Sequence, residues 1–132
     1  MTGVQTCALP ISYAKASQSD DPALAQRARK GKIRTELRVA EFWMALQDAE
    51  HLRADFPTDP EAISLHADAL WSSGLFDESD RAYRDALALA PESSRARFGL
   101  ARSLATRSRL SEALDEALLA SASAPKIGRA HV

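Results

Sequence analysis

The sequence predicts an all-α protein built of stacked antiparallel helix-turn-helix pairs, an α-solenoid. Three observations point to this class. Pro57, Pro91 and Pro125 are equally spaced along the chain, and a fixed period of about 34 residues is typical of helical repeats. Apolar residues between these prolines recur at helical spacing. The composition also favours helices, since the chain is rich in Ala, Leu and Arg and poor in Val, Thr and Gly.

Composition and charge exclude several other classes. The 17 basic and 18 acidic side chains give a net charge of −1, so no overall field attracts nucleic acid or an anionic membrane. The single cysteine excludes an internal disulfide framework and a cysteine-based zinc site. No apolar run approaches the roughly 18 residues of a transmembrane helix. We therefore expect no association with a membrane.

The middle unit, residues 58–91, shows the helix signals most clearly. Asp59 is a good N-cap and Pro60 a good first helical residue. Gly74 interrupts the apolar pattern, as expected between two helices. The first predicted helix buries Ile63, Ala67 and Leu70, and the second, from Phe76, buries Ala82, Tyr83, Ala86 and Leu87 before Pro91 ends it.

The last unit, residues 92–125, repeats this organisation one period later. Ser93 or Ser94 caps its first helix. Small residues recur in both units at two equivalent places, and small side chains allow paired helices to approach closely. The matched small residues are Ala67 with Ala101 and Ala86 with Ala120, and the last unit's larger apolar residues are Leu100, Leu104, Leu110, Leu114 and Leu118.

The first unit, residues 23–57, follows the pattern less closely. Its second helix, from Glu41 to Asp55, fits well, but its first helix, from Ala23 to Val39, does not keep the register cleanly. The interval from Pro22 to Pro57 is longer than the period by a single position, which predicts an insertion in this unit. Gly31 weakens the helix prediction further. Residues 12–22 are interpreted as the remnant of a preceding repeat.

This pattern resembles the tetratricopeptide repeat (TPR) family over roughly residues 23–125, most strongly over 58–125. The family's small, aromatic and proline positions are occupied, although Ser79 replaces an alanine, Ser108 replaces a glycine, and the family's early tryptophan is missing. The matching residues are Ala67, Leu70, Gly74, Phe76, Ala86 and Pro91, and then Ala101, Leu104, Leu110, Ala113, Ala120 and Pro125. The resemblance implies a right-handed superhelix.

The resemblance also implies a concave groove that binds a peptide or helix of a partner protein. Chaperone-binding members clamp a peptide carboxylate with asparagines, but this chain has Leu65, Asp68, Gly99 and Arg102 at those places, which argues against a chaperone C-terminus. Trp71 is either an anchor for the partner or packs against the next repeat. The groove residues implied by the family pattern are Glu61, Ser64, Asp68 and Trp71 from one helix and Arg95, Phe98 and Arg102 from the next.

The two ends of the chain are related to each other at the nucleotide level. Ile127–Val132 can be encoded by a stretch whose reverse complement encodes Thr6–Ile11. Such an inverted repeat resembles a translated sequencing adapter. Residues 1–11 and 126–132 are therefore interpreted as assembly artefacts, and the first segment is expected to be disordered. The alternative, a short uncleaved leader over residues 1–11, lacks a basic segment and a long apolar core.

No catalytic or metal-binding motif accompanies the repeats. His51 and His66 lack metal-ligand spacing, and the sequence has no nucleophile elbow and no phosphate-binding glycine loop. The acidic residues Asp77, Glu78 and Asp80 begin a predicted helix, where they interact favourably with the helix dipole. We therefore expect no catalytic residue, no cofactor and no metal.

The favoured function is a non-catalytic protein–protein interaction scaffold. One alternative is a docking or regulatory segment of a larger bacterial-type enzyme, a hydrolase or a transferase. Another is RNA binding through the basic stretch at residues 27–38, although no aromatic residue lies within it for base stacking. We also expect weak self-association through the last repeat, because Leu110, Leu114 and Leu118 lack a polar capping helix.

Overall fold

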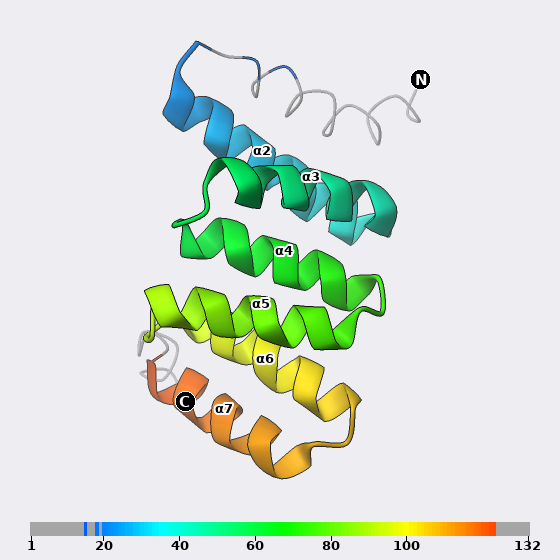
Figure 1. Cartoon of the computed structure of the whole chain (residues 1–132), viewed down its shortest axis with the longest axis vertical. Helices are drawn as coiled ribbons and strands as arrows, with labels where there is room; N and C mark the ends of the chain where they lie inside the picture. The colour runs from blue at the N-terminus through cyan, green and yellow to red at the C-terminus, as the bar shows by residue number, and fades with distance from the viewer. Residues whose placement is uncertain (1–14, 16–17, 19, 124–132) are drawn as a thin grey trace, which may run out of the picture.

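The computed structural model describes residues 15, 18 and 20–123, and both terminal segments interpreted as artefacts lie outside this range. Within residues 20–123, six helices stack one after another, each antiparallel to the one before it (Figure 1). No strand occurs in the described part of the chain. The helices are α2 (Pro22–Arg38), α3 (Phe42–Asp55), α4 (Pro60–Ser72), α5 (Phe76–Leu89), α6 (Ser94–Thr106) and α7 (Leu110–Ser123).

The helix boundaries repeat with the period of the sequence. The three even-numbered helices end at Arg38, Ser72 and Thr106, which are separated by the same interval as the prolines. The first unit therefore contains no insertion between its helices, contrary to the expectation drawn from Pro22. Instead, α2 extends further at its start, with 17 residues against 13 in α4 and α6. Asp21 caps this extension, and Pro22 is its first residue.

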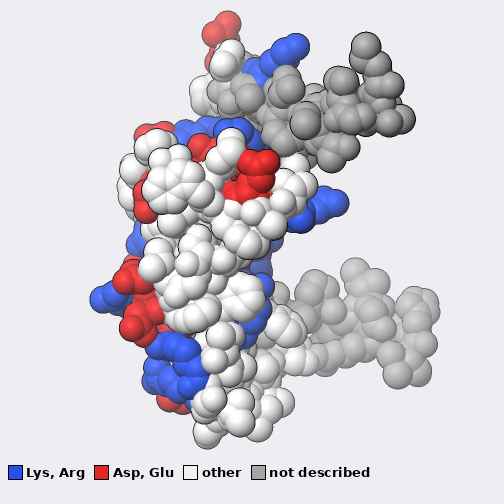
Figure 2. Space-filling view, turned by 90° about the vertical axis from the view of Figure 1, so that its right-hand side faces the viewer, with Lys and Arg blue, Asp and Glu red and all other residues white. Residues whose placement is uncertain are grey.

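Each helix pair is joined by a turn that contains a residue with positive φ. These residues are Ala40 (φ 63°), Gly74 (φ 81°) and Ser108 (φ 60°), at equivalent places in the three units. A left-handed residue just after a helix ends it and reverses the chain, and glycine does so at the lowest cost. Figure 2 looks onto the side of the molecule that carries these turns, and the middle of this side is largely uncharged.

One continuous core runs along the stack. It contains alanines where neighbouring helices approach each other and larger side chains between them. Tyr83 is the largest side chain that is fully buried. No helix in residues 20–123 is long and apolar enough to cross a membrane.

Candidate partner-binding groove

The residues implied as groove-forming lie on α4 and α6, but they do not form one set. Four of them, Asp68, Arg95, Phe98 and Arg102, line a cavity of about 280 Å³ together with Gly99. This arrangement follows from the repeat, because α4 and α6 are the equivalent first helices of consecutive units and pack against each other. This cavity is the centre of the candidate groove.

Asp68 is the acidic member of the described residues that line the cavity, and it faces two guanidinium groups. Its Oδ2 accepts from Arg95 Nη2 at 2.9 Å, and its Oδ1 lies 3.4 Å from Arg102 Nη2. The hydroxyl of the buried Tyr83 also donates to Asp68. Burial, reinforced by this carboxylate, raises the pKa of Tyr83, so the phenol remains a donor. The cavity therefore keeps an excess of positive charge.

Trp71 lies beside the cavity, and Arg102 covers one face of its half-buried ring. The Arg102 guanidinium carbon is 3.9 Å from the ring centroid, which is a close cation–π contact. The indole Nε1 points to Thr106 Oγ1 at 3.4 Å, and the ring lies 6.3 Å from that of Phe76. Phe98, by contrast, is 58% exposed. Of the two aromatic candidates, Phe98 is the more exposed.

Two implied groove residues do not line this cavity. Ser64 is buried, and its hydroxyl donates to the Pro60 carbonyl at 2.8 Å. Glu61 pairs with Lys30 at 2.8 Å and also with Arg34, both on α2. The family pattern places Ser64 and Glu61 on the first helix of the unit. The sequence alone does not show which basic residue forms an ion pair with Glu61.

Most of the basic residues of α2 pair with acids of the elements that follow it. Lys30 also pairs with Asp59 at 2.6 Å, and Arg29 pairs with Asp55 at 2.7 Å. Lys32 pairs with Asp48. A surface that binds a nucleic-acid backbone needs cations free to contact phosphates. The arrangement at α2 instead ties this helix to α3 and α4.

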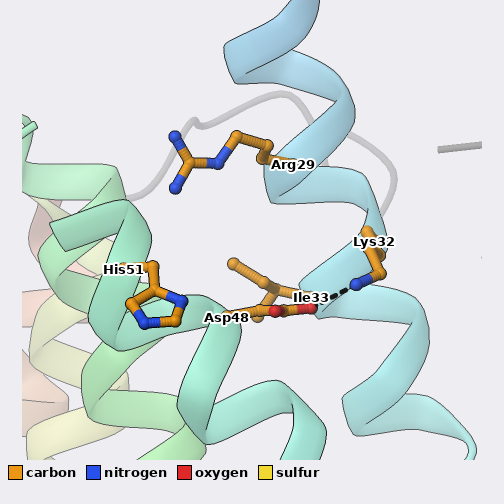
Figure 3. A pocket seen from close by; sticks show the side chains of 5 residues that line it. All are labelled: Arg29, Lys32, Ile33, Asp48 and His51. Atoms are coloured by element: carbon orange, nitrogen blue, oxygen red, sulfur yellow. Dashed lines mark hydrogen bonds and ion pairs between the residues drawn. The ribbon is translucent and has the colours of Figure 1, made fainter. Parts of the chain in front are cut away.

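A second cavity, of about 320 Å³, lies between α2 and α3 and was not foreseen from the sequence. Arg29 and Lys32 reach into it from α2, and Asp48 and His51 reach into it from α3, with Ile33 between them (Figure 3). Its charges largely cancel through the ion pairs described above. Among residues 20–123, no group of three or more acidic, histidine or cysteine side chains is arranged to hold a metal.

Buried acids near these cavities also escaped sequence analysis. Glu36 is 1% exposed, next to Lys32 and Asp48. Burial, together with the Asp48 carboxylate, raises its pKa to about 7. Asp80, at the start of α5, is also buried and pairs with Arg107 across the junction to α6, as does Asp77. The position of an acidic residue in a helical pattern does not reveal whether its side chain is buried. No signal in the sequence therefore identified these contacts.

A third cavity, of about 350 Å³, opens on the outer face of the last helix pair. It lies between α6 and α7, and apolar side chains dominate its lining. Leu110, Leu114 and Leu118 are each at least 60% exposed. The expectation that these leucines are exposed therefore holds, whereas their role in self-association stays a prediction.

A family model for the tetratricopeptide repeat matches residues 64–126. This part of the chain therefore carries tetratricopeptide repeats. No curated protein sequence matches this TPR chain.

Solved structures with the same fold include three titled MamA. MamA AMB-1 superposes with a TM-score of 0.68 at 22% identity, covering 89% of this chain and 66% of that one. MamA MSR-1 gives 0.67 at 21% identity, with 89% and 64% covered. MamA from Desulfovibrio magneticus RS-1 gives 0.67 at 20% identity, with 74% and 55% covered. The TPR chain thus spans somewhat over half the length of these structures, and the likeness concerns their fold.

Proposed function

We propose that this TPR chain is a non-catalytic protein-interaction module that holds a peptide or helix of a partner protein in the groove between α4 and α6. One observation carries the proposal. The cavity of about 280 Å³ combines two guanidinium groups, a single carboxylate and the exposed ring of Phe98. Such a site offers polar groups that fix orientation beside an apolar anchor.

A role without catalysis agrees with the state of the acidic side chains. Asp68, Asp77 and Asp80 all pair with arginines, so these three residues offer no pair of free carboxyl groups facing an open cleft. A docking segment of a larger enzyme would use the same groove. A catalytic motif in the parent reading frame would distinguish that alternative from a free-standing scaffold.

The groove can be tested with a phage-displayed library of random dodecapeptides, selected on the full chain. We expect enriched sequences whose binding weakens at least about tenfold with Phe98→Ala, because a central aromatic anchor contributes more than about 1.4 kcal/mol. Leu75→Ala, in the α4–α5 turn, is the matched control, since Leu75 is also exposed. If no sequence is enriched, or if both variants weaken binding equally, the groove is not a peptide site.

Weak self-association is a second candidate property, favoured by the exposed leucines of α7. Contiguous apolar side chains on a small domain are typical of interaction surfaces. We expect the elution volume in size-exclusion chromatography to decrease as protein concentration increases, and Leu118→Glu to suppress this change. A monomer at all concentrations would contradict self-association and leave the peptide groove unaffected.

A further inference from the structure

The outer cavity between α6 and α7 has an occupied counterpart inside the molecule. Its lining residues Arg102, Leu114 and Ala117 occupy the places that Asp68, Asp80 and Tyr83 hold in the preceding repeat. Those earlier residues are covered by α6, which pairs with Asp68 and packs Gly99 against the Tyr83 ring, while Arg107 at its end pairs with Asp80. The outer cavity is thus the place where a helix seated like α6 would lie.

The junctions inside the molecule show which charge such a helix needs. At the first junction, Arg34 of α2 pairs with Glu61, the second residue of α4. At the next junction, Asp68 of α4 pairs with Arg95, the second residue of α6. The charge of the receiving residue alternates along the stack, and at the outer face this residue is Arg102. Complementarity therefore requires a carboxylate at the second residue of the arriving helix.

Side-chain size gives a second criterion. Opposite the large Tyr83, the arriving helix α6 has Gly99, because a Cβ at this place would overlap the ring. The equivalent of Tyr83 at the first junction is the small Ala49, and the equivalent of Gly99 is the larger Leu65; both are fully buried. At the outer face the receiving residue is Ala117, again small. A large apolar residue is therefore needed four places after the carboxylate, to fill the space at native density.

The outer face thus resembles the surface of α2 and α3 that α4 covers. Arg102, Leu114 and Ala117 repeat the types of Arg34, Leu46 and Ala49. We infer that the outer face of α6 and α7 binds an amphipathic helix of a partner protein that resembles α4, with a carboxylate at its second residue and a large apolar residue four places later. A folded second copy has no such helix to offer, because its own α4 is buried between its neighbours.

A peptide with the sequence of α4 is the direct probe. It spans residues 59–72. A hydrocarbon staple joins the places of Ser64 and Asp68, which lie on the side that faces the next helix. Because the staple keeps the peptide helical, helix formation does not limit binding. Its affinity for the full chain can be measured by fluorescence anisotropy. We expect the peptide with Glu61→Arg to bind at least about tenfold more weakly, and the Arg102→Glu chain to reverse this preference.

Two chain variants show whether binding occurs at the outer face. Leu114→Glu places a charge in the cavity and should abolish binding, whereas Leu119→Glu changes an exposed leucine of the same helix outside the cavity and should not. Circular dichroism checks that each variant is folded. Equal binding of both peptides, equal effects of the two glutamates, or no binding at millimolar peptide would overturn the inference. A dimer of the chain that the peptide does not displace would also overturn it, because a second copy would then occupy the face.

Discussion

Tyr83 and Gly99 form a close contact between α5 and α6. The ring is fully buried, its hydroxyl donates to Asp68, and a Cβ on Gly99 would overlap it. Gly99→Ala should therefore lower the free energy of unfolding by about 1–3 kcal/mol, although alanine is the better helix former by about 1 kcal/mol. Urea denaturation measures the change. In a Tyr83→Leu background the same substitution should be neutral or stabilising, and a stable Gly99→Ala single variant would contradict this packing.

Glu36 makes stability depend on pH. Its pKa is raised to about 7 in the folded chain, by burial first and then by Asp48, against about 4.5 in the unfolded chain. The folded state thus holds the proton more tightly, so Glu36 lowers stability as pH rises from about 4.5 to 7. Glu36→Gln removes this loss.

The variant should therefore gain roughly 2–3 kcal/mol more over the natural chain at pH 8 than at pH 4.5. Urea denaturation at both pH values measures this difference. His66, whose pKa burial and then Arg53 lower to about 4, destabilises the fold in the opposite direction, below about pH 6.5. Because His66 is present in both proteins, its contribution cancels in the comparison. Glu50→Gln, at an exposed site on α3, is the control. A gain independent of pH would show that Glu36 is not proton-linked.

At the scale of the helix pair, the turn residues are equivalent in conformation but not in type. Ala40, Gly74 and Ser108 share a positive φ, and nothing lies within 4 Å of a Cβ added to Gly74. Only the backbone dihedral then decides the effect of a substitution. Gly74→Ala should cost about 1 kcal/mol, and Ala40→Gly and Ser108→Gly should each gain a similar amount. Thermal denaturation measures all three. A gain for Gly74→Ala would contradict a left-handed turn residue.

The helix pairs were predictable from the sequence because their signals are local. Asp59, Pro60 and Gly74 mark helix ends by backbone chemistry, and the repeat period then transfers the assignment to the other units. The extent of α2 was predicted closely, with Ala23–Val39 expected and Pro22–Arg38 observed, but Asp21 and Pro22 were interpreted as the end of an earlier repeat instead of as a cap and a first residue. Neighbouring turn signals fit both interpretations.

The groove was less predictable, because it depends on long side chains that choose among partners in space. Arg102 covers Trp71 and pairs with Asp68, and Ser64 bonds to its own helix. None of these choices follows from spacing along a helix. The family pattern implied α4 and α6 as the helices of the proposed groove, but only the packed structure shows that Phe98 is exposed and that Arg102 covers one face of Trp71.

At the scale of the whole molecule, stability is unevenly distributed along the stack. In a repeat array each helix is stabilised only by its neighbours. Seven of the 13 residues of α4 are buried, between α2–α3 on one side and α5–α6 on the other. In α7, of 14 residues, only Ala113 and Ala120 are buried. Local opening should therefore be easiest at α7, since it packs against α6 alone, whereas α4 packs against four helices of the described chain.

Amide hydrogen exchange measures this gradient directly. We expect amides in α7 to exchange at least about tenfold faster than those in α4, because a difference in opening free energy of about 1.4 kcal/mol already produces that ratio. Leu114→Glu, on the exposed face of α7, should leave the rates in α4 unchanged. If α7 is instead as protected as α4, its outer apolar face must be covered in solution. Leu114→Glu then shows whether a contact at the outer face causes the protection. The variant would restore fast exchange in α7 only if an apolar contact at Leu114 had slowed it.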